Sequence, residues 1–179
     1  MKHARLRPLQ MTDLDSIMPW INDPEVVKNF QNFDKEVTRE EEQRYLEKML
    51  ASPHDKLFAI ETEAGEYLGN AGIHDIHTKN NEGRLGLIIG NKKQWGGGYG
   101  QSAVRALIQY AFEVCDLHRI ELRVFEENAK ARHIYQKVGF VEEGVMRKKY
   151  ADREGKYHDM VLMAMLREDY EARKTGDRK

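Results

Sequence analysis

The chain has 179 residues, of which 40% are hydrophobic and 33% charged, and its 29 basic and 30 acidic residues leave a net charge of −1. This composition indicates a soluble globular domain with a substantial core, and the balanced charge gives no argument for a nucleic-acid partner. We find no apolar run of the roughly 18 residues that a membrane span needs, and the single cysteine, Cys115, excludes an internal disulfide, so a cytoplasmic location is expected.

The first third of the chain predicts a strand and two helices. Residues 4–10 alternate weakly, as in a strand. Thr12 and Asp15 resemble a capping box, and the apolar spacing that follows predicts a helix ending at "NDP", residues 22–24. Thr38 and Glu41 form a second box-like start, for a helix that ends before Pro53.

The middle of the chain predicts strands followed by a helix. "KLFAIET", "YLGNAGIHDI" and "RLGLIIG" read as three strands joined by the turns "EAGE" and "NNEG". Residues 96–100, "GGGYG", then precede an amphipathic helix. Its apolar positions fall on one face, which places Cys115 in the core: Val104, Leu107, Ile108, Ala111, Phe112 and Cys115.

The last third predicts a strand, a helix and two strands. "RIELRVFE" alternates as a strand, and Asn128 can cap a short helix that Gly139 ends. Two strands follow, at about 145–150 and 157–166, around the turn "DREG". We therefore expect a mixed α/β fold with a central strand–helix–strand crossover, one domain over residues 1–170 and a flexible tail over 171–179.

The glycine-rich loop is the first functional signal. Four of the five residues from Gly96 to Gly100 are glycine, and they lie where a strand gives way to a helix. Free backbone N–H groups and the positive end of the helix dipole bind phosphate at such a point, and glycine removes the Cβ that would hold an anion away. The alternative is a tight turn without a ligand. The spacing fits neither a P-loop nor a dinucleotide fingerprint.

Two blocks of the sequence resemble the GNAT superfamily of acyl-CoA-dependent N-acetyltransferases. "WGGGYG", residues 95–100, is similar to the family's R/Q-x-x-G-x-G/A signature at Gly98 and Gly100, with Trp95 in place of Arg or Gln. "ENAKARHIYQKVGFVEEG", residues 127–144, resembles its second block. The branch that contains ribosomal-protein alanine acetyltransferases and spermidine/spermine acetyltransferases is similar over nearly the whole chain.

This resemblance implies a fold and a cosubstrate. The fold would be a mixed, mostly antiparallel sheet that splays at a central parallel strand pair, with helices on both faces. Acetyl-CoA would be the cosubstrate, and no metal is expected. Its pantetheine would pair with the backbone of the strand before the glycine loop. The alternative is that this strand is an ordinary buried one, and both can hold together. The implied contacts are Ile88, Ile89, Gly90, Trp95, Gly96, Gly97, Gly98, Tyr99, Gly100, Gln101, Asn128 and Tyr135.

The reaction requires an acid for the departing thiolate and a neutral amine. Tyr135 is the predicted acid, since a phenol stays protonated at neutral pH and the resemblance places it seven residues after Asn128. Its alternative is an aromatic ring packed on the sheet, and Asn128 could be only a helix cap.

The base is less defined than the acid. Glu82 is the predicted base, although Arg84 stands where relatives often have an acid, and Glu82 could lie solvated in a turn. Three residues of the preceding strand, His74, Asp75 and His77, are competitors, as is a water chain. A metal site at "HDIH" is not expected, because residues three apart on a strand point to opposite faces.

The amine acceptor is predicted only as a class. Carboxylates near aromatic side chains suit a cation, so a polyamine or other small amine is ranked first. A peptide amine, an amino sugar, and a non-catalytic acyl-CoA-binding module remain alternatives, and a homodimer is expected by analogy. The acidic tract, which could instead be a solvated helix start, comprises Asp23, Glu25, Asp34, Glu36, Glu40, Glu41 and Glu42.

Overall fold

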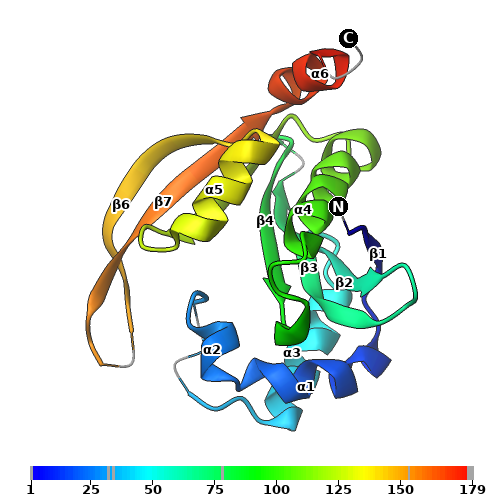
Figure 1. The fold of residues 1–179 in the computed structure, drawn as a ribbon, viewed down its shortest axis with the longest axis vertical. Coiled ribbons are helices and arrows are strands. Elements are labelled where there is room, and N and C mark those ends of the chain that lie inside the picture. The colour runs from blue at the N-terminus through cyan, green and yellow to red at the C-terminus, as the bar shows by residue number, and fades with distance from the viewer. Residues whose placement is uncertain (1, 32, 34, 78, 153, 177–179) are drawn as a thin grey trace.

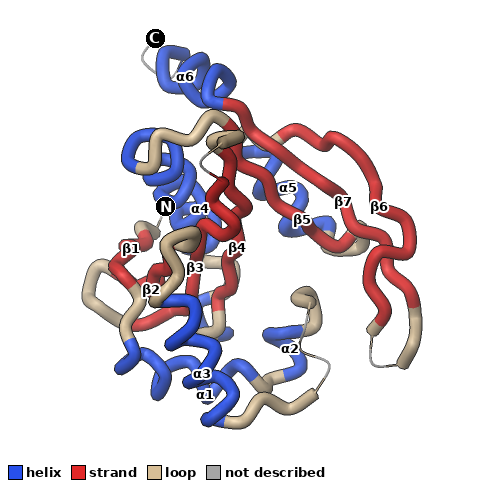
Figure 2. Tube along the Cα trace, turned by 180° about the vertical axis from the view of Figure 1, so that it is seen from behind, coloured by secondary structure: helices blue, strands red, loops and turns tan. Residues whose placement is uncertain are grey.

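The computed structural model describes residues 2–31, 33, 35–77, 79–152 and 154–176. In this part of the chain a seven-stranded sheet carries helices on both faces (Figures 1 and 2). The strands are β1 (Ala4–Pro8), β2 (Lys56–Thr62), β3 (Tyr67–His77), β4 (Glu82–Ile89), β5 (Arg119–Phe125), β6 (Val141–Ala151) and β7 (Tyr157–Leu166). The helices are α1 (Leu14–Ile21), α2 (Pro24–Val27), α3 (Arg39–Leu50), α4 (Tyr99–Gln109), α5 (Ala129–Val138) and α6 (Arg167–Gly176).

The sheet has the order β1-β2-β3-β4-β5-β7-β6. All neighbouring strands are antiparallel except β4 and β5, which are parallel and are joined by the crossover through α4. The predicted fold class, mixed α/β with a mostly antiparallel sheet and a central parallel pair, is confirmed.

The parallel pair separates soon after it forms. Its register joins Glu82 to Arg119, Gly83 to Ile120 and Arg84 to Glu121, and it ends there although both strands continue. Figure 2 shows β5 diverging from β4 beyond these positions. We call the unpaired continuation, residues 85–89 of β4 and 122–125 of β5, the splay.

Two hydrophobic clusters lie on opposite faces of the sheet. Along β4 the side chains alternate between them: Leu87 and Ile89 pack on the cluster that contains α4, whereas Ile88 packs on the cluster that contains α1 and Leu46 of α3. Tyr135 of α5 also packs on the α4 cluster. The two faces of the splay are therefore built by different helices, α4 and α5 on one side and α1 to α3 on the other.

The helix starts agree with the sequence in one case and differ in another. Thr38 and Glu41 cap α3 reciprocally, as predicted. The predicted Thr12–Asp15 box is wrong, because a 3₁₀ turn over Met11–Asp13 precedes α1 and the Asp13 carboxylate accepts from the backbone N–H of Gln10 at 2.8 Å. The buried Asp13 is held there by a salt bridge that Thr12 could not make.

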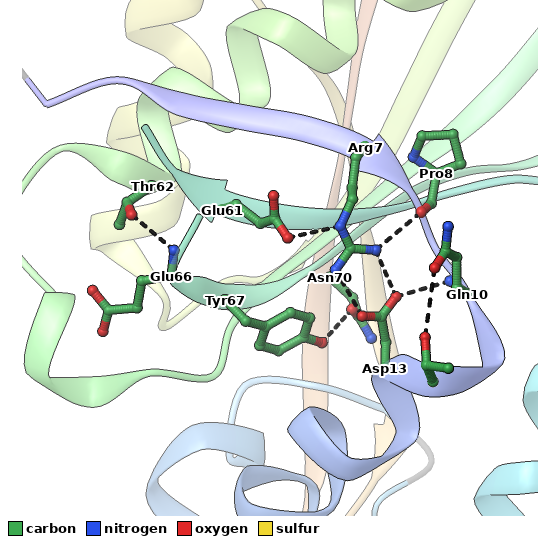
Figure 3. Close-up of polar contacts among 10 residues, drawn as sticks. Arg7, Pro8, Gln10, Asp13, Glu61, Thr62, Glu66, Tyr67 and Asn70 are labelled. Atoms are coloured by element: carbon green, nitrogen blue, oxygen red, sulfur yellow. Dashed lines mark hydrogen bonds and ion pairs between the residues drawn. The ribbon is translucent and has the colours of Figure 1, made fainter. Parts of the chain in front are cut away.

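That salt bridge ties the start of α1 to the sheet (Figure 3). The Arg7 guanidinium donates to both carboxylate oxygens of Asp13, at 2.8 and 2.7 Å, and its Nε donates to Glu61 at 2.7 Å. The guanidinium and the Gln10 amide lower the pKa of Asp13 against the opposing effect of burial, which is the largest influence on this carboxyl. Bidentate arginine pairs of this kind fix geometry as well as charge.

Two helices were not predicted. Asp23 caps the short α2 by accepting from the Glu25 N–H, and Pro24, read from the sequence as a terminator, instead occupies the first turn of this new helix. Helix α6 continues to Gly176 and so covers residues 171–176 of the predicted tail; residues 177–179 lie outside the described part of the chain. The flexibility of the tail stays a prediction.

Strand β6 forms one edge of the sheet and begins at Val141, earlier than predicted. Its pairing with β7 shifts register between Glu142 and Gly144 and again between Met146 and Tyr150. Among the described helices, none is long and apolar enough to cross a membrane.

Candidate active site

The backbone of β4 faces the splay at alternate residues. The N–H of Gly90 donates to the Leu68 carbonyl of β3 at 2.8 Å, and the ladder register is continuous from Ile89 to Arg84. Because the main-chain groups of an antiparallel strand alternate in direction, those of Leu87 and Ile89 point away from β3, toward the side where β5 has separated. Of the predicted backbone contacts, Ile89 thus faces the splay, whereas Ile88 and Gly90 face β3.

The glycine loop leads from β4 into α4. Gly96 and Gly98 have φ values of 79° and 90°, in the left-handed region that glycine enters without a Cβ clash, and Gly98 is the N-cap residue of α4. The Ser102 N–H makes a helical bond to the Gly98 carbonyl at 3.0 Å, so the amides of Tyr99, Gly100 and Gln101 precede the bonded turns.

The same helix end carries an unsatisfied donor. Gln101 Nε2 is a buried side-chain nitrogen without a hydrogen-bond partner in the described structure. A Cβ at Gly96 would meet nothing within 4 Å, so that position is open. Free amides, a buried amide donor and open space fit a diphosphate ligand.

Trp95 joins the glycine loop to the splay. Its indole Nε1 donates to the Ile89 carbonyl at 2.8 Å, which occupies one of the main-chain acceptors that point away from β3. Trp95 is 37% exposed. The position that departs from the glycine signature therefore holds the loop against β4, a contact that the sequence alone did not indicate.

Tyr135 lies on α5, on the α4 face of the sheet. The ring is half-buried and contacts Phe140 edge-on at 5.9 Å between ring centroids. Burial raises the pKa of Tyr135 to about 12, so the hydroxyl keeps its proton at neutral pH. Within the described part of the chain no group hydrogen-bonds to this hydroxyl, so it is available to donate.

Asn128 caps α5, as the sequence predicted. Its Oδ1 accepts from the Ala131 N–H at 3.2 Å. The side chain thus has a structural task, and contact with a cosubstrate stays a prediction. Cys115 is partly buried and packs against the α4 cluster, and burial raises the pKa of its thiol, in accord with the predicted core position.

The candidate bases occupy different places. Glu82 lies at the paired end of β4, where its Oε1 accepts from Asn80 at 3.2 Å and its Oε2 is 4.0 Å from Arg119. Asp75 is exposed and binds Arg84 at 2.5 Å, which lowers the pKa of its carboxyl.

The two histidines of β3 also differ. His77 is exposed, whereas His74 is part-buried, with Nδ1 3.0 Å from Asp55 Oδ1. Asp55 was not singled out in the sequence, because only the fold brings the segment before β2 beside β3. Among the described residues no group of three or more acidic, histidine or cysteine side chains could hold a metal.

A family model described as an acetyltransferase (GNAT) domain matches residues 3–141. The chain belongs to the GNAT acetyltransferase family. It is therefore an N-acetyltransferase, and acetyl-CoA is its cosubstrate. The predicted cosubstrate contacts of this GNAT chain lie in β4, in the glycine loop and at α5.

The relatives of this GNAT chain are named for different acceptors. Spermidine N(1)-acetyltransferase of Vibrio cholerae is 28% identical over 165 residues, 92% of this chain and 94% of the relative. The putative ribosomal N-acetyltransferase YdaF of Bacillus subtilis is 32% identical over 111 residues, 62% and 59% of the two chains. The crystal structure of V. cholerae spermidine N-acetyltransferase with CoA and spermine has a TM-score of 0.85 at 25% identity, covering 94% of this chain and 98% of that one.

The acidic tract of this GNAT chain is largely engaged in its own structure. Lys92 pairs with Asp23 at 2.6 Å and with Glu25 at 3.0 Å, and Lys35 pairs with Glu41 at 2.5 Å. Glu42 is buried, and Asp34 lies outside the described residues. The tract therefore offers an acceptor fewer free carboxylates than the sequence suggested.

Proposed function

We propose that this acetyltransferase moves the acetyl group of acetyl-CoA directly to a primary amine, with a polyamine or another small amine as the acceptor. The observation that carries the proposal is the splay, in which main-chain groups of Leu87 and Ile89 are turned from β3 toward a strand that has left the ladder. An extended cosubstrate arm can hydrogen-bond there as a missing strand would.

The glycine loop and α5 would supply the other hydrogen-bond donors to acetyl-CoA. The amides of Tyr99, Gly100 and Gln101 would hold the diphosphate at the positive end of α4. The Tyr135 hydroxyl, which stays protonated because burial raises its pKa to about 12, would then donate to the departing sulfur. The reaction also needs a base, for which Glu82 is so far only a prediction from the sequence.

A polyamine acceptor is supported by likeness to the spermidine acetyltransferases over nearly the whole chain. One observation favours a second candidate, a peptide α-amine with acidic neighbours. Arg147 and Lys148 of β6, together with Asp159 of β7, line an open cavity of about 570 Å³. Its net positive charge suits anionic side chains better than a polycation.

The experiment is a thiol-release assay with acetyl-CoA and a panel of spermidine, spermine, amino sugars, aminoglycosides and acidic N-terminal peptides. We expect turnover with at least one amine and the highest rate with a polyamine. Tyr135→Phe should lower kcat by about 100-fold, because one general acid is removed, with acetyl-CoA affinity unchanged by calorimetry.

Ala131→Ser, a change on the same helix, is the matched control and should keep wild-type turnover. Absence of thiol release with every amine would contradict the proposed function. Unchanged turnover in Tyr135→Phe would remove only the acid assignment.

A further inference from the structure

We propose that His74, oriented by Asp55, is the general base that takes the proton from the acceptor amine. This inference rests on the proposed function and assigns the one role that the reaction leaves open. The position of the imidazole relative to the splay supports this role.

Asp55 fixes the imidazole from one side. Its Oδ1 is 3.0 Å from His74 Nδ1, and its Oδ2 accepts from the Ser52 hydroxyl at 2.5 Å. The exposed fractions of the two side chains are only 20% and 12%, so both are held within the fold. A carboxylate acceptor places the imidazole proton on Nδ1 and leaves the Nε2 lone pair free to accept one.

Two glycines make room for that second nitrogen. Gly72 of β3 and Gly86 of β4 are cross-strand partners, and the His74 ring covers both. Nε2 lies 2.6 Å from where a Cβ would stand on Gly72 and 3.4 Å from the same point on Gly86. Any side chain at Gly72 would displace the imidazole.

This position is at the mouth of the splay. Arg84 is the last residue of β4 that pairs with β5, and Gly86 is only two residues farther along. His74 shares a sheet face with Gly86 and Ile88, the α1 face, whereas Tyr135 packs with Leu87 and Ile89 on the α4 face. A thioester in the splay would thus have the acid on one side and the base on the other.

Glu82 is placed less well for this task. It lies within the paired part of β4, before Arg84, and already interacts with Asn80 and Arg119. A group at the paired end is separated from the splay by the last rungs of the parallel ladder. The His74 ring instead covers Gly86, the second residue of the splay along β4.

The charged and titratable groups around His74 come from each neighbouring element. Asp55 precedes β2, and Arg84 of β4 is the cross-strand partner of His74 and binds Asp75. Tyr45 of α3 is close enough for Asp55 and Arg84 to influence its pKa, which burial raises. At the imidazole itself, the Asp55 carboxylate lies 3.0 Å from Nδ1, and Arg84 is the residue opposite on β4.

The proton balance of the step closes within these residues. The amine nitrogen forms its bond to the thioester carbon and loses a proton to His74 Nε2. The carbon–sulfur bond breaks, and the sulfur takes the proton of the Tyr135 hydroxyl. Proton exchange with solvent returns the imidazolium and the phenolate to their starting states.

The first experiment compares variants with acetyl-CoA and the panel amine of highest turnover. His74→Gln should lower kcat by about 100-fold or more while the KM for acetyl-CoA changes by less than about twofold. It should also abolish the rise of kcat/KM on the acidic side of the pH profile. His77→Gln, an exposed histidine of the same strand, is the matched control, and Glu82→Gln tests the rival base; both should keep that rise.

Two further measurements exclude a merely structural role. Imidazole added to His74→Ala should restore part of the lost turnover. Nitrogen-15 NMR of the wild-type histidines should show the Nδ1–H form of His74, and Asp55→Asn should change it.

Turnover by the unmodified chain tests the proposed function, whereas the variants test His74. Wild-type kcat in His74→Gln, or loss of the acidic limb in Glu82→Gln alone, would overturn the inference.

Discussion

Glu42 is a buried acidic residue of α3, with 6% of the residue exposed. No cation pairs with it among the described residues. Burial raises its pKa from the usual 4.5 to about 7, because the charged form loses its hydration. The folded chain therefore holds a proton on Glu42 over a pH range in which the unfolded chain has released it.

Glu42→Gln should consequently stabilise the protein, and more so at higher pH. Below about pH 4.5 both states are protonated and the change gains little. As the pH rises toward about 7 the cost of the native residue grows, and above it the cost is complete. At about 1.4 kcal/mol per pH unit, the gain in the free energy of unfolding at pH 8 is at most about 3 kcal/mol.

Urea unfolding of both chains at pH 5 and pH 8 measures this gain. Glu40→Gln, on the exposed side of the same turn, is the control and should change stability by less than about 0.5 kcal/mol at either pH. A Glu42→Gln chain less stable than wild type at pH 8 would show that the carboxylate has a partner.

Individual residues were predictable from sequence where a local rule decides them. Asn128 was predictable as the cap of α5, because asparagine is a preferred N-cap residue and a short amphipathic segment follows it. His74 depends on a cross-strand glycine pair and on Asp55, which lies 19 residues away along the chain. No local pattern contains that register, so the sequence left His74 among three competitors.

At the scale of elements, the start of α4 combines a backbone requirement with a ligand requirement. Gly98 has a φ of 90°, which a residue with a Cβ adopts only at a cost of about 1–2 kcal/mol. Gly100 lies inside the helix, and a Cβ there would meet only Ile89 Cγ1, at 3.8 Å. Gly98 therefore meets the backbone requirement, whereas Gly100 leaves room for a ligand beside the first turn of the helix.

Gly98→Val should lower the free energy of unfolding by about 2 kcal/mol and weaken acetyl-CoA binding by at least about tenfold. Gly65→Val, at a left-handed glycine in the turn between β2 and β3, is the control and should lose a similar stability with binding retained. Calorimetric titration and urea unfolding give the two quantities separately. Normal acetyl-CoA affinity in Gly98→Val would argue against the loop as the diphosphate site.

The periodic elements were predictable because each carries an uninterrupted apolar pattern, as α4 and β5 do. The helices that were not predicted are either short or have a sequence that fits more than one position. Pro24 can end one helix or begin another, and only the seating of Val26 and Val27 in the core decides for α2. Helix α6 has few apolar residues, so its sequence resembles a flexible tail. The contact between Tyr170 and Phe112 that holds it in place is visible only in the fold.

At the scale of the whole molecule, α6 joins the end of β7 to the segment that follows α4. The Tyr170 ring stacks on Phe112 at 5.0 Å, and its hydroxyl donates to Glu113 at 2.5 Å. Arg167 donates to the Phe112 carbonyl at 2.8 Å and pairs with Asp116 at 2.7 Å. These contacts connect the half of the sheet that contains β7 with the helix that covers the other half.

Tyr170→Ala should therefore reduce the free energy of unfolding by about 2–3 kcal/mol, the loss of a partly buried ring and its hydrogen bond. Tyr157→Ala removes a tyrosine that is 61% exposed and should cost less than about 1 kcal/mol. Urea denaturation compares the two, and equal losses would show that α6 contributes little to stability.

The sequence also predicted the seven strands and helices α1, α3, α4 and α5 in their order along the chain, but not where the sheet separates. The length of the parallel pairing depends on how helices on both faces pack, which no single segment encodes. The glycine loop lies between β4 and α4, as predicted, whereas the direction of the Ile88 and Gly90 main-chain groups toward β3 was not predicted.

The irregular edge strand β6 has a consequence for the behaviour of the molecule in concentrated solution. Its two register shifts, and the left-handed Lys148 with a φ of 51°, leave only short straight stretches of exposed ladder. Consecutive cations at Arg147, Lys148 and Lys149 would repel their counterparts on a second copy approaching in parallel register. Bulges and edge lysines of this kind discourage open-ended stacking, so we expect this border of the sheet to resist polymerisation and fibre growth.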